Sequence, residues 1–483
     1  MNEVQLLIGG KSLAAADGRT FERKDPVHGS VVTRAAAASP ADVNAAVEAG
    51  AAAFPAWAET GPNHRRAVLM QAADVLTARQ DEFVQAVIQE TGATGSWGGF
   101  NVSFAAHILR EAAAITTQVS GEVIPSDVPG NLAMGIRQPH GVCAGIAPWN
   151  APVILGVRAV ATALACGNTV VLKASETCPA VHRLIGTVLQ EAGLPDGVLN
   201  VITHAPQDAP AVVSALIGHP AVRHLNFTGS TRVGRIVAEQ AAHQLKPVLL
   251  ELGGKAPLIV LDDADLDAAV NAAAFGAYMN QGQICMSTER IVVDESVADE
   301  FVQRLAAKAS SLSLRDPSEG PAVLGSIVDP AASDRVQQLL ADAQSKGASL
   351  AAGGHCNGTL MDATVLDRVT PAMRIYAEES FGPVVSIVRV NGEEEALEAA
   401  NDSEYGLSAA IFSRNFQRAW NLARRVQSGI CHINGPTVHD EAQMPFGGMK
   451  ASGYGRFGGK AGINEFTVLR WITVQTGERH YPF

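Results

Sequence analysis

The spacing of hydrophobic residues changes several times along this chain of 483 residues. Short apolar runs that end in glycine or proline predict strands and turns over residues 4–35. From Ser39-Pro40 onward, apolar residues recur at helical spacing, which predicts a block of helices over residues 40–118. Residues 119–139 contain two short apolar runs and predict a hairpin that projects from the body.

From residue 140 the pattern alternates between buried strands and amphipathic helices. Strands are predicted at 141–146, 168–173, 198–202 and 222–227, with helices beginning at Pro152 and spanning 179–193 and 231–244. This alternation indicates a parallel, doubly wound sheet. A second α/β run is predicted over about 257–450, and a terminal strand over 469–474.

Composition and charge narrow the class of protein. Hydrophobic residues make up 47% and charged residues 17%, as in a large globular protein with a substantial core, and the length predicts about three structural units. The net charge of −12 argues against nucleic acid or an anionic membrane surface as the main partner. No apolar run reaches about 18 residues, and no signal peptide precedes the first strand, so we expect no membrane span.

The six cysteines form no CxxC pair and no cluster with histidine at metal-ligand spacing. This scattered distribution is typical of a reducing compartment, so a cytoplasmic location and no metal site are expected. Cys285 follows Gly282 and Gln283, which can bring backbone close to the sulfur instead of packing it. It is a candidate nucleophile, although a lone cysteine is more often a small buried hydrophobe.

Two further motifs could act with this cysteine. Glu251 ends an apolar run before two glycines, and a carboxylate held in apolar surroundings can act as a general base. Asn150 follows Pro148 and Trp149 at the end of a predicted strand, where its amide could donate to a developing oxyanion. The alternative for Asn150 is an ordinary turn residue.

Two strand ends could bind a dinucleotide. Gly229 and Ser230 lie between a strand and a helix, where backbone N–H groups can approach a phosphate. Lys173, Ser175 and Glu176 follow the second strand, and an acidic residue there could accept the ribose hydroxyls. Taken alone these signals are weak, because the first is not GxGxxG and could be a capped turn, and the second could be a solvated ion pair.

Together the motifs give a specific resemblance. The chain resembles, from end to end, an aldehyde dehydrogenase of the NAD(P)-dependent superfamily, with Glu251 and Cys285 separated by 34 residues. The matching segments, in the family's order, are Pro148-Trp149-Asn150, Lys173-Ala174-Ser175-Glu176, Phe227-Thr228-Gly229-Ser230-Thr231, Leu250-Glu251-Leu252-Gly253-Gly254-Lys255, Gly282-Gln283-Ile284-Cys285, Glu378-Glu379-Ser380-Phe381-Gly382-Pro383 and Pro445-Phe446-Gly447-Gly448.

The resemblance implies two doubly wound α/β domains and a β oligomerisation arm. The NAD-binding domain would comprise residues 1–118 and 140–250, and the catalytic domain residues 251–450. The arm would comprise 119–139 and 451–483 and would assemble a homodimer or homotetramer.

The resemblance also implies a role for each motif. Cys285 would attack the aldehyde, Asn150 and the Cys285 N–H would stabilise the oxyanion, and Glu251 would activate water to hydrolyse a thioester. NAD, and possibly NADP, would be the cofactor. Its binding residues would be Pro148, Trp149, Lys173, Ser175, Glu176, Gly229, Ser230, Glu379 and Phe381.

Within the family, residues 282–290 and the C-terminal end resemble the bacterial branch that oxidises aromatic aldehydes. Ala151 and Arg158 stand where many relatives that oxidise aliphatic aldehydes carry bulky aromatic residues. Asn150, Ile154 and Arg158 share one predicted helix face, so Ala151, Ile154, Arg158 and Phe446 are candidate pocket residues. Arg158 could contact a ring hydroxyl or stack on the ring, or it could simply pair with a carboxylate.

The expected substrate is therefore vanillin or a related hydroxybenzaldehyde, with salicylaldehyde and benzaldehyde as alternatives. A different class of function is a Cys/Glu esterase that keeps the fold and works without a cofactor.

Overall fold

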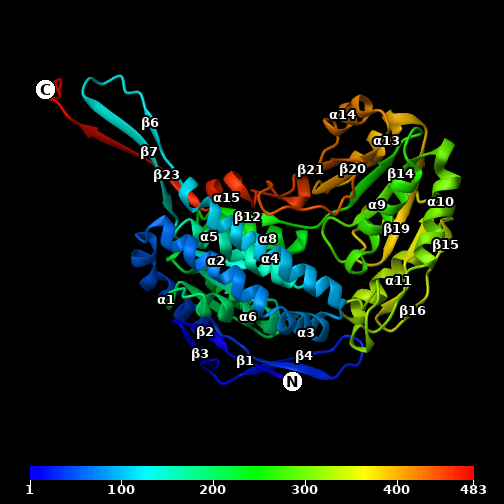
Figure 1. Ribbon diagram of the computed structural model, residues 1–483, viewed down its shortest axis with the longest axis horizontal. Coiled ribbons are helices and arrows are strands. Elements are labelled where there is room, and N and C mark those ends of the chain that lie inside the picture. The colour runs from blue at the N-terminus through cyan, green and yellow to red at the C-terminus, as the bar shows by residue number, and fades with distance from the viewer.

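Two separate β-sheets form the centres of two large units in the computed structural model, which describes residues 1–483 (Figure 1). The first sheet has eight strands, of which the five central ones run parallel. Its order is β22 (Gly453–Tyr454), β12 (Val248–Glu251), β11 (Val222–Thr228), β8 (Val142–Ile146), β9 (Thr169–Lys173), β10 (Leu199–Ile202), β2 (Leu6–Ile8) and β3 (Lys11–Leu13).

Helices cover both faces of this sheet because successive strand residues point to opposite sides. Leu172 packs with α5 and α6, whereas its neighbour Val171 packs with the cluster that includes α1. The helices of the first unit are α1 (Pro40–Ala58), α2 (Pro62–Ala78), α3 (Gln80–Thr91), α4 (Gly95–Ile115), α5 (Pro152–Ala165), α6 (Pro179–Glu191), α7 (Ala209–Gly218) and α8 (Thr231–His243).

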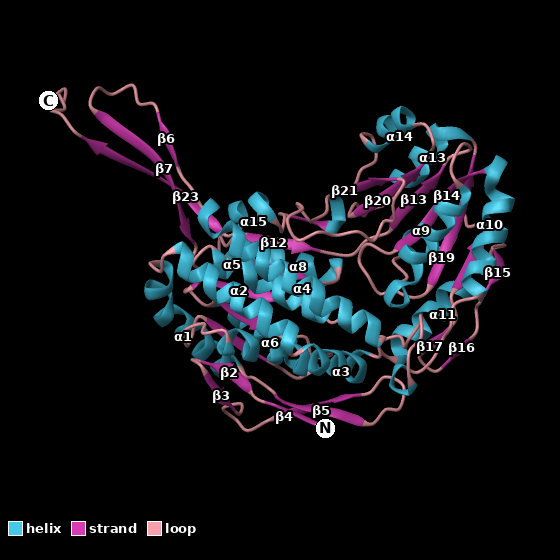
Figure 2. Cartoon of the chain, viewed as in Figure 1, coloured by secondary structure: helices cyan, strands magenta, loops and turns pink.

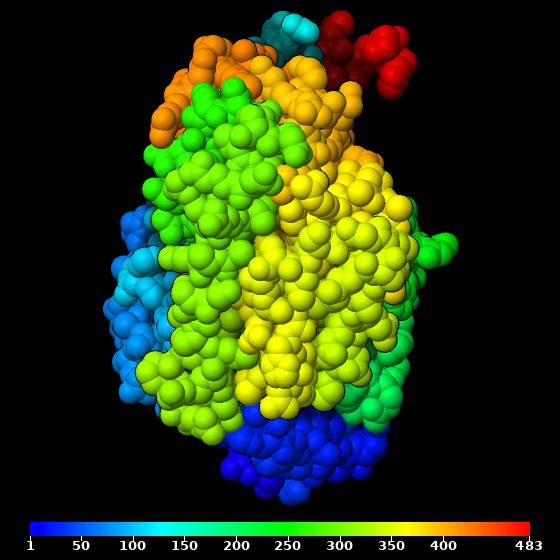
Figure 3. All heavy atoms as spheres, turned by 90° about the vertical axis from the view of Figure 1, so that its right-hand side faces the viewer, coloured from blue at the N-terminus to red at the C-terminus, as the bar shows by residue number.

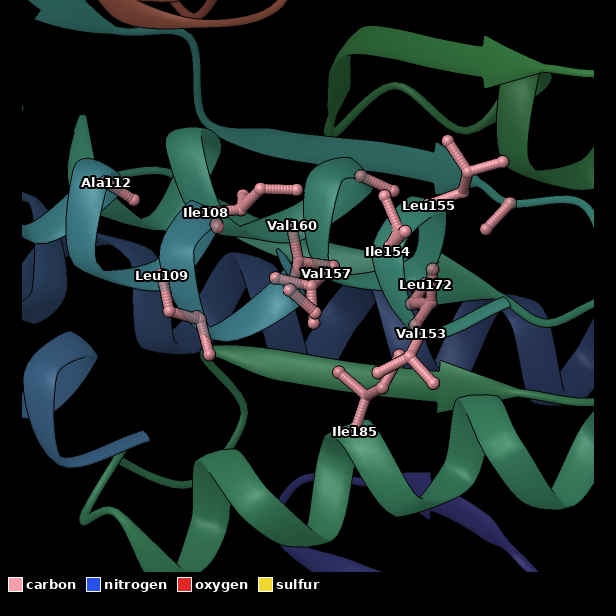
Figure 4. Close-up of a cluster of buried hydrophobic side chains, with 14 of the residues drawn as sticks. Ile108, Leu109, Ala112, Val153, Ile154, Leu155, Val157, Val160, Leu172 and Ile185 are labelled. Carbon is pink, nitrogen blue, oxygen red and sulfur yellow. The ribbon is translucent and has the colours of Figure 1, made fainter. Parts of the chain in front are cut away.

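Helix α5 lies in the middle of the larger core, and all of its residues are buried. Figure 4 shows Val153, Ile154 and Val157 of α5 among side chains from α4, α6 and β9. Pro152 occupies the first turn, where a missing N–H costs no helical hydrogen bond. A helix packed on every side is a rigid support, so the loop just before it is firmly placed.

The second sheet has seven strands, parallel except at β15. Helices α9 (Leu266–Tyr278) and α10 (Glu295–Ser310) cover one face. Helices α11 (Pro330–Ser345), α12 (Arg374–Ala377), α13 (Gly392–Asn401) and α14 (Phe416–Ala423) belong to the other. The strand order is β15 (Ser349–Ala352), β18 (Thr364–Asp367), β19 (Val384–Val390), β14 (Thr288–Asp294), β13 (Ala256–Val260), β20 (Ser408–Phe412) and β21 (Ile430–Ile433).

A three-stranded arm projects from the first unit (Figure 2). It consists of β6 (Glu122–Ile124), β7 (Asn131–Pro139) and β23 (Thr467–Gln475), and β23 pairs with β7 along its whole length. The predicted hairpin and terminal strand are thus both present. The rest of the C-terminal segment behaves differently, because β22 pairs with β12 of the first sheet and α15 (Gly459–Glu465) packs on α4.

The N-terminal segment forms a smaller sheet, and Figure 3 shows this segment, in blue, below the second unit. It has the order β1 (Asn2–Val4), β5 (Val31–Ala36) and β4 (Thr20–Lys24). Arg23 of β4 donates to the Val328 carbonyl at 2.9 Å, and Thr359, in the turn between β16 (Cys356–Asn357) and β17 (Leu360–Met361), donates to the Pro26 carbonyl at 3.1 Å. These contacts tie the N-terminal segment to the second unit.

The predicted α/β alternation is confirmed element by element between residues 140 and 244, with bounds that differ by a few residues. None of the helices is both long enough and apolar enough to cross a membrane. The His, Cys, Asp and Glu side chains form no group of three or more that could hold a metal ion.

Candidate active site

The site lies where the chain passes from the first unit to the second. Glu251 is the last residue of β12, and the segment after it leads directly into β13 of the second sheet. Gly254 in this segment runs against the cysteine loop, since a Cβ there would lie 2.2 Å from the Cys285 carbonyl oxygen. Only glycine permits this approach, which brings the strand end that carries Glu251 close to Cys285.

The loop before Cys285 has an unusual backbone. Asn280, Gln281 and Gly282 are consecutive left-handed residues, with φ values of 49°, 57° and 70°. Left-handed φ is uncommon for residues other than glycine and requires support from the surroundings. Gln281 provides it, because its amide accepts from Gly325 N at 3.0 Å and donates to the Ser326 carbonyl at 2.9 Å.

Asn150 is held by two hydrogen bonds to this loop and by one from Trp97 of α4. Its side-chain Nδ2 donates to the Gln283 carbonyl at 2.9 Å. Its own carbonyl accepts from Trp97 Nε1 at 3.0 Å and from Asn280 Nδ2 at 2.9 Å. The side chain of Asn150, in the loop between β8 and α5, therefore contacts Gln283, which precedes Cys285 by two residues. The buried start of α5 holds this loop in place.

Glu251 and Cys285 are the two reactive groups at the centre. Neither carboxylate oxygen of Glu251 has a hydrogen-bond partner, and the residue is buried. Burial raises the pKa of Glu251 to about 7, against smaller opposing effects of Cys285 and Arg158. Burial and then the charge of Glu251 hold the pKa of the Cys285 thiol well above its ordinary value. A buried carboxylate that titrates near neutrality beside a thiol is suited to proton transfer.

The predicted ribose site lies at the carboxyl end of β9. Lys173 Nζ lies 3.8 Å from Glu176 Oε2, and His204 Nε2 lies 3.9 Å from the same oxygen. Burial lowers the pKa of His204 to about 4, so this histidine is neutral. Although burial opposes it, the charge of Lys173 brings the pKa of Glu176 below its usual value, so the carboxylate is ionised. Ser175 lies beside them, and its N–H donates to His182 Nδ1 at 3.0 Å.

The predicted phosphate and nicotinamide residues come from three loops. Ser230 caps α8 by accepting a hydrogen bond from Val233 N at 3.4 Å. The helix therefore begins directly after Gly229 and Ser230, and Ser230 is exposed. Trp149, next to Pro148, meets the ring of Phe381 edge to face, with centroids 5.7 Å apart. Glu379 accepts from Gly254 N at 2.8 Å, which links it to the segment beside Cys285.

The pocket candidates divide into two kinds. Ala151 and Ile154 are buried in the core around α5, as expected for apolar walls. Arg158 is buried in an ion pair with Asp440, and its guanidinium stacks on the Phe446 ring at 4.5 Å from the centroid. Arg158 therefore pairs with a carboxylate, which is the alternative that the sequence left open, and its contact with a substrate ring stays a prediction.

Sequence reasoning missed two groups that support the site. Asp440 pairs with Arg158 across 282 residues of sequence. Glu289, only four residues after Cys285, pairs with Lys255 at 2.8 Å and accepts from Ser380 N, Ser380 Oγ and Phe381 N. The only sequence signal for either is charge within a motif-rich segment, which alone does not identify a partner.

Comparison with known proteins agrees with this arrangement. The family model described as "Aldehyde dehydrogenase family" matches residues 13–472. This chain belongs to the aldehyde dehydrogenase family. The family resemblance and the expected fold are thus confirmed, and the chain is an aldehyde dehydrogenase by family.

Individual aldehyde dehydrogenases match over the whole chain. A vanillin dehydrogenase from Pseudomonas fluorescens is 65% identical over 482 residues, covering 100% of both chains. The crystal structure of a salicylaldehyde dehydrogenase from Pseudomonas putida G7, complexed with salicylaldehyde, superposes with a TM-score of 0.99 at 48% identity, covering 100% of both chains. PnpE from Pseudomonas sp. WBC-3, solved in complex with nicotinamide adenine dinucleotide, has a TM-score of 0.96 at 36% identity, covering 100% of this chain and 99% of that one.

Proposed function

We propose that this enzyme oxidises an aromatic aldehyde, namely vanillin or a related hydroxybenzaldehyde, to the carboxylic acid with NAD. The observation that carries the chemistry is the grouping of Cys285, Asn150 and the unpartnered carboxylate of Glu251 around one buried loop. The ring substrate is supported by the names of the full-length relatives and by the small Ala151 beside Asn150.

In the first step the Cys285 thiol gives its proton to solvent, and the thiolate sulfur attacks the aldehyde carbon. An S–C bond forms, and the carbonyl electron pair moves to oxygen as an alkoxide. The Asn150 amide carries two N–H groups, of which one is engaged by the Gln283 carbonyl. The other, with the Cys285 N–H, is available to stabilise the oxyanion.

The residues at the cofactor face fit a dinucleotide. Glu176 is an ionised acceptor suited to two ribose hydroxyls, the N-terminus of α8 at Ser230 suits a pyrophosphate, and Glu379 suits the second ribose. Lys173 and Phe381 would flank the two riboses. When bound, NAD supplies the acceptor for the hydride that the oxyanion expels, which leaves a Cys285 thioester.

Glu251 completes the cycle as general base. Its raised pKa places it near half ionisation at neutral pH, where it can take a proton from water as the hydroxide attacks the thioester carbon. The C–S bond breaks, the acid leaves, and Cys285 is regenerated as a thiol. Burial without hydrogen bonds is what keeps this carboxylate basic.

Cofactor choice and assembly follow from charge and exposure. The ionised Glu176 would repel a 2′-phosphate, so we propose NAD in preference to NADP. The arm exposes Leu469, Trp471 and Val474, and such an apolar surface is suited to a second copy of the chain. We therefore propose a homo-oligomer, a dimer or a tetramer, assembled through the arm.

The proposal is tested by following reduced nicotinamide at saturating NAD with a panel of benzaldehydes. We expect vanillin, salicylaldehyde and benzaldehyde to be oxidised, with vanillin preferred, and Cys285→Ala to bind NAD without turnover. A cofactor-independent esterase would instead cleave 4-nitrophenyl acetate without NAD and leave the aldehydes unchanged. Absence of aldehyde-dependent NAD reduction in the wild type would overturn the proposal.

A further inference from the structure

One oxygen of the ion pair beside the pocket is unsatisfied. Oδ2 of Asp440 is engaged by Arg158, but Oδ1 is buried and has no hydrogen-bond partner. A buried acceptor without a donor is unfavourable, and native structures usually satisfy such atoms with protein, water or a ligand. Glu251 is the other carboxylate with this property near the site, and there the missing partner is explained by proton transfer. Asp440 takes no part in that chemistry, so its free oxygen needs a different explanation.

The space beside Asp440 fits one polar substituent. A narrow hollow of about 10 Å³ is lined by Arg158, Asp440 and Phe446 together with α4 residues such as Ile108 and Ala112. Half of its lining residues are apolar, and the Arg158–Asp440 pair supplies the charge. A hollow of this size and lining suits a single hydroxyl group carried by an apolar ring.

The hollow is also in line with the reacting atoms. Arg158 lies six residues into α5, about 9 Å along the axis from Pro152, and Asn150 lies just before that helix. Arg158 shares a helix face with Ile154, which lies one turn nearer to Asn150. The charges of Arg158 and Asp440 both influence the pKa of Glu251, which shows that the pair lies within electrostatic reach of the centre.

We propose that Asp440 is a specificity-determining residue, whose free Oδ1 accepts a hydrogen bond from a neutral hydroxyl on the substrate ring, at the position farthest from the aldehyde. Arg158 is then a positioning residue that orients Asp440 through the ion pair rather than the group that reads the ring. This inference rests on the proposed function, because it assumes that a benzaldehyde occupies the pocket.

Asp440 would accept a hydrogen bond from the ring, whereas Arg158 would donate one. The two cases therefore predict opposite preferences for a hydroxyl and for a carboxylate on the ring. If Asp440 reads the ring, a hydroxyl that donates is favoured and an anionic carboxylate is repelled. If Arg158 reads the ring directly, the carboxylate is favoured. Four probes separate these cases, namely benzaldehyde, 4-hydroxybenzaldehyde, 4-methoxybenzaldehyde and 4-carboxybenzaldehyde, each measured as kcat/KM relative to benzaldehyde with full-length enzyme and saturating NAD.

For the wild type we expect 4-hydroxybenzaldehyde to exceed 4-methoxybenzaldehyde by about 10- to 100-fold, the range of a charge-assisted hydrogen bond, and 4-carboxybenzaldehyde to be the poorest of the four. Asp440→Asn removes the negative charge and should reduce the hydroxyl preference while improving relative use of the carboxylate. Arg158→Lys keeps a cation beside Asp440 and should retain most of the hydroxyl preference.

Removing one partner of a buried pair can destabilise the protein, so two further variants are included. In Arg158→Leu/Asp440→Leu neither charge remains, and the hydroxyl-to-methoxy ratio should approach one without improved use of the carboxylate. Asp367→Asn is the matched control, because Asp367 forms a similarly buried pair with Arg389 at 2.7 Å in the second sheet. It should leave all substrate ratios at their wild-type values.

Equal use of the hydroxy and methoxy compounds by the wild type would overturn the inference, as would a wild-type preference for the carboxylate. The inference would also be overturned if Asp440→Asn, like Asp367→Asn, left all substrate ratios at their wild-type values. These results differ from failure of the proposed function, in which the wild type would not reduce NAD with any of the four aldehydes.

Discussion

The side-chain amide of Asn150 donates to the Gln283 carbonyl oxygen at 2.9 Å, and this bond fixes the amide beside the loop that carries Cys285. Trp97 and Asn280 hold the Asn150 carbonyl from the other side. The main chain at Asn150 is thus anchored independently of its side chain. An oxyanion donor held in this way needs no rearrangement during the reaction, which is the condition for strong electrostatic stabilisation.

Asn150→Ala should lower kcat by about 10²- to 10³-fold, the usual effect of losing one oxyanion donor. The loop should persist, because Trp97 Nε1 and Asn280 Nδ2 donate to the main-chain carbonyl of residue 150, which the substitution retains. The measurement is steady-state kcat, with the rate of Cys285 alkylation by iodoacetamide as the control for an intact loop. A kcat close to wild type would show that Asn150 has only a structural role.

Glu251→Gln should separate the two halves of the reaction. Acylation should still give a stoichiometric burst of reduced nicotinamide in stopped-flow measurements, and the following turnover should be slower by orders of magnitude. The reason is that glutamine cannot take the proton from the attacking water. If the burst slows as much as the turnover, Glu251 is also required to deprotonate the thiol of Cys285.

The same substitution should change the pH dependence of stability. Because the pKa of Glu251 is about 7 in the folded protein and about 4.3 in an unfolded chain, its contribution is fully present below about pH 4.3 and is lost as the pH rises through 7. The loss is about 4 kcal/mol at most. Glu251→Gln removes this penalty, so its apparent melting temperature should exceed that of the wild type at pH 8, with a much smaller difference at pH 5. An equal difference at both pH values would contradict the buried, raised carboxylate.

The nucleophile, the base and the alternating strands of the first sheet could be predicted because each is encoded locally. Cys285 lies in a short motif, and the buried strands between residues 140 and 230 show continuous apolar runs. The partner of Arg158 could not be predicted, because Asp440 reaches it only after the whole second sheet has folded. For the same reason no pattern in residues 451–466 shows that β22 pairs with β12 rather than joining the arm.

Whether a predicted side chain is paired or hydrogen-bonded depends on residues that are distant in the sequence. Sequence spacing placed Asn150, Ile154 and Arg158 on one helix face, but α5 begins at Pro152, so Asn150 precedes the helix. Spacing also carries no information on whether a guanidinium is paired. Likewise, Glu251 was a candidate base from its apolar neighbours, but only the structure shows that both of its oxygens lack partners.

Glu176→Ser should raise activity with NADP relative to NAD. The ionised Glu176 lies beside Lys173, and removing its charge should leave Lys173 free to attract a 2′-phosphate. We expect the ratio of kcat/KM for NADP to that for NAD to rise by about 10-fold or more, since a charge repulsion of one to two kcal/mol corresponds to this factor. Glu404→Ser, which removes an exposed carboxylate paired with Arg235, is the control. A wild type that already prefers NADP would contradict the role given to Glu176.

The loop that carries Glu379 and Phe381 is held by a buried ion pair. Lys255 Nζ donates to Glu289 at 2.8 Å and to the Glu378 carbonyl at 2.8 Å. Glu289 in turn accepts from Ser380 and Phe381. Phe381 has a positive φ of 48°, a conformation that needs such support. Because Lys255 follows Glu251 by four residues and Glu289 follows Cys285 by four, the pair connects the catalytic segments to the cofactor loop.

Glu289→Gln should therefore weaken cofactor binding more than it affects the reactivity of the cysteine. Without its charge, Glu289 no longer holds Lys255, and the loop can leave the geometry that presents Glu379. We expect KM and Kd for NAD to rise by about 10-fold, with little change in the rate of Cys285 alkylation, and a lower melting temperature because Lys255 becomes a buried unpaired charge. In Lys255→Met/Glu289→Met the melting temperature should recover in part while the weak NAD binding remains. If NAD binding recovers together with stability, the pair only stabilises the fold and does not position the cofactor loop.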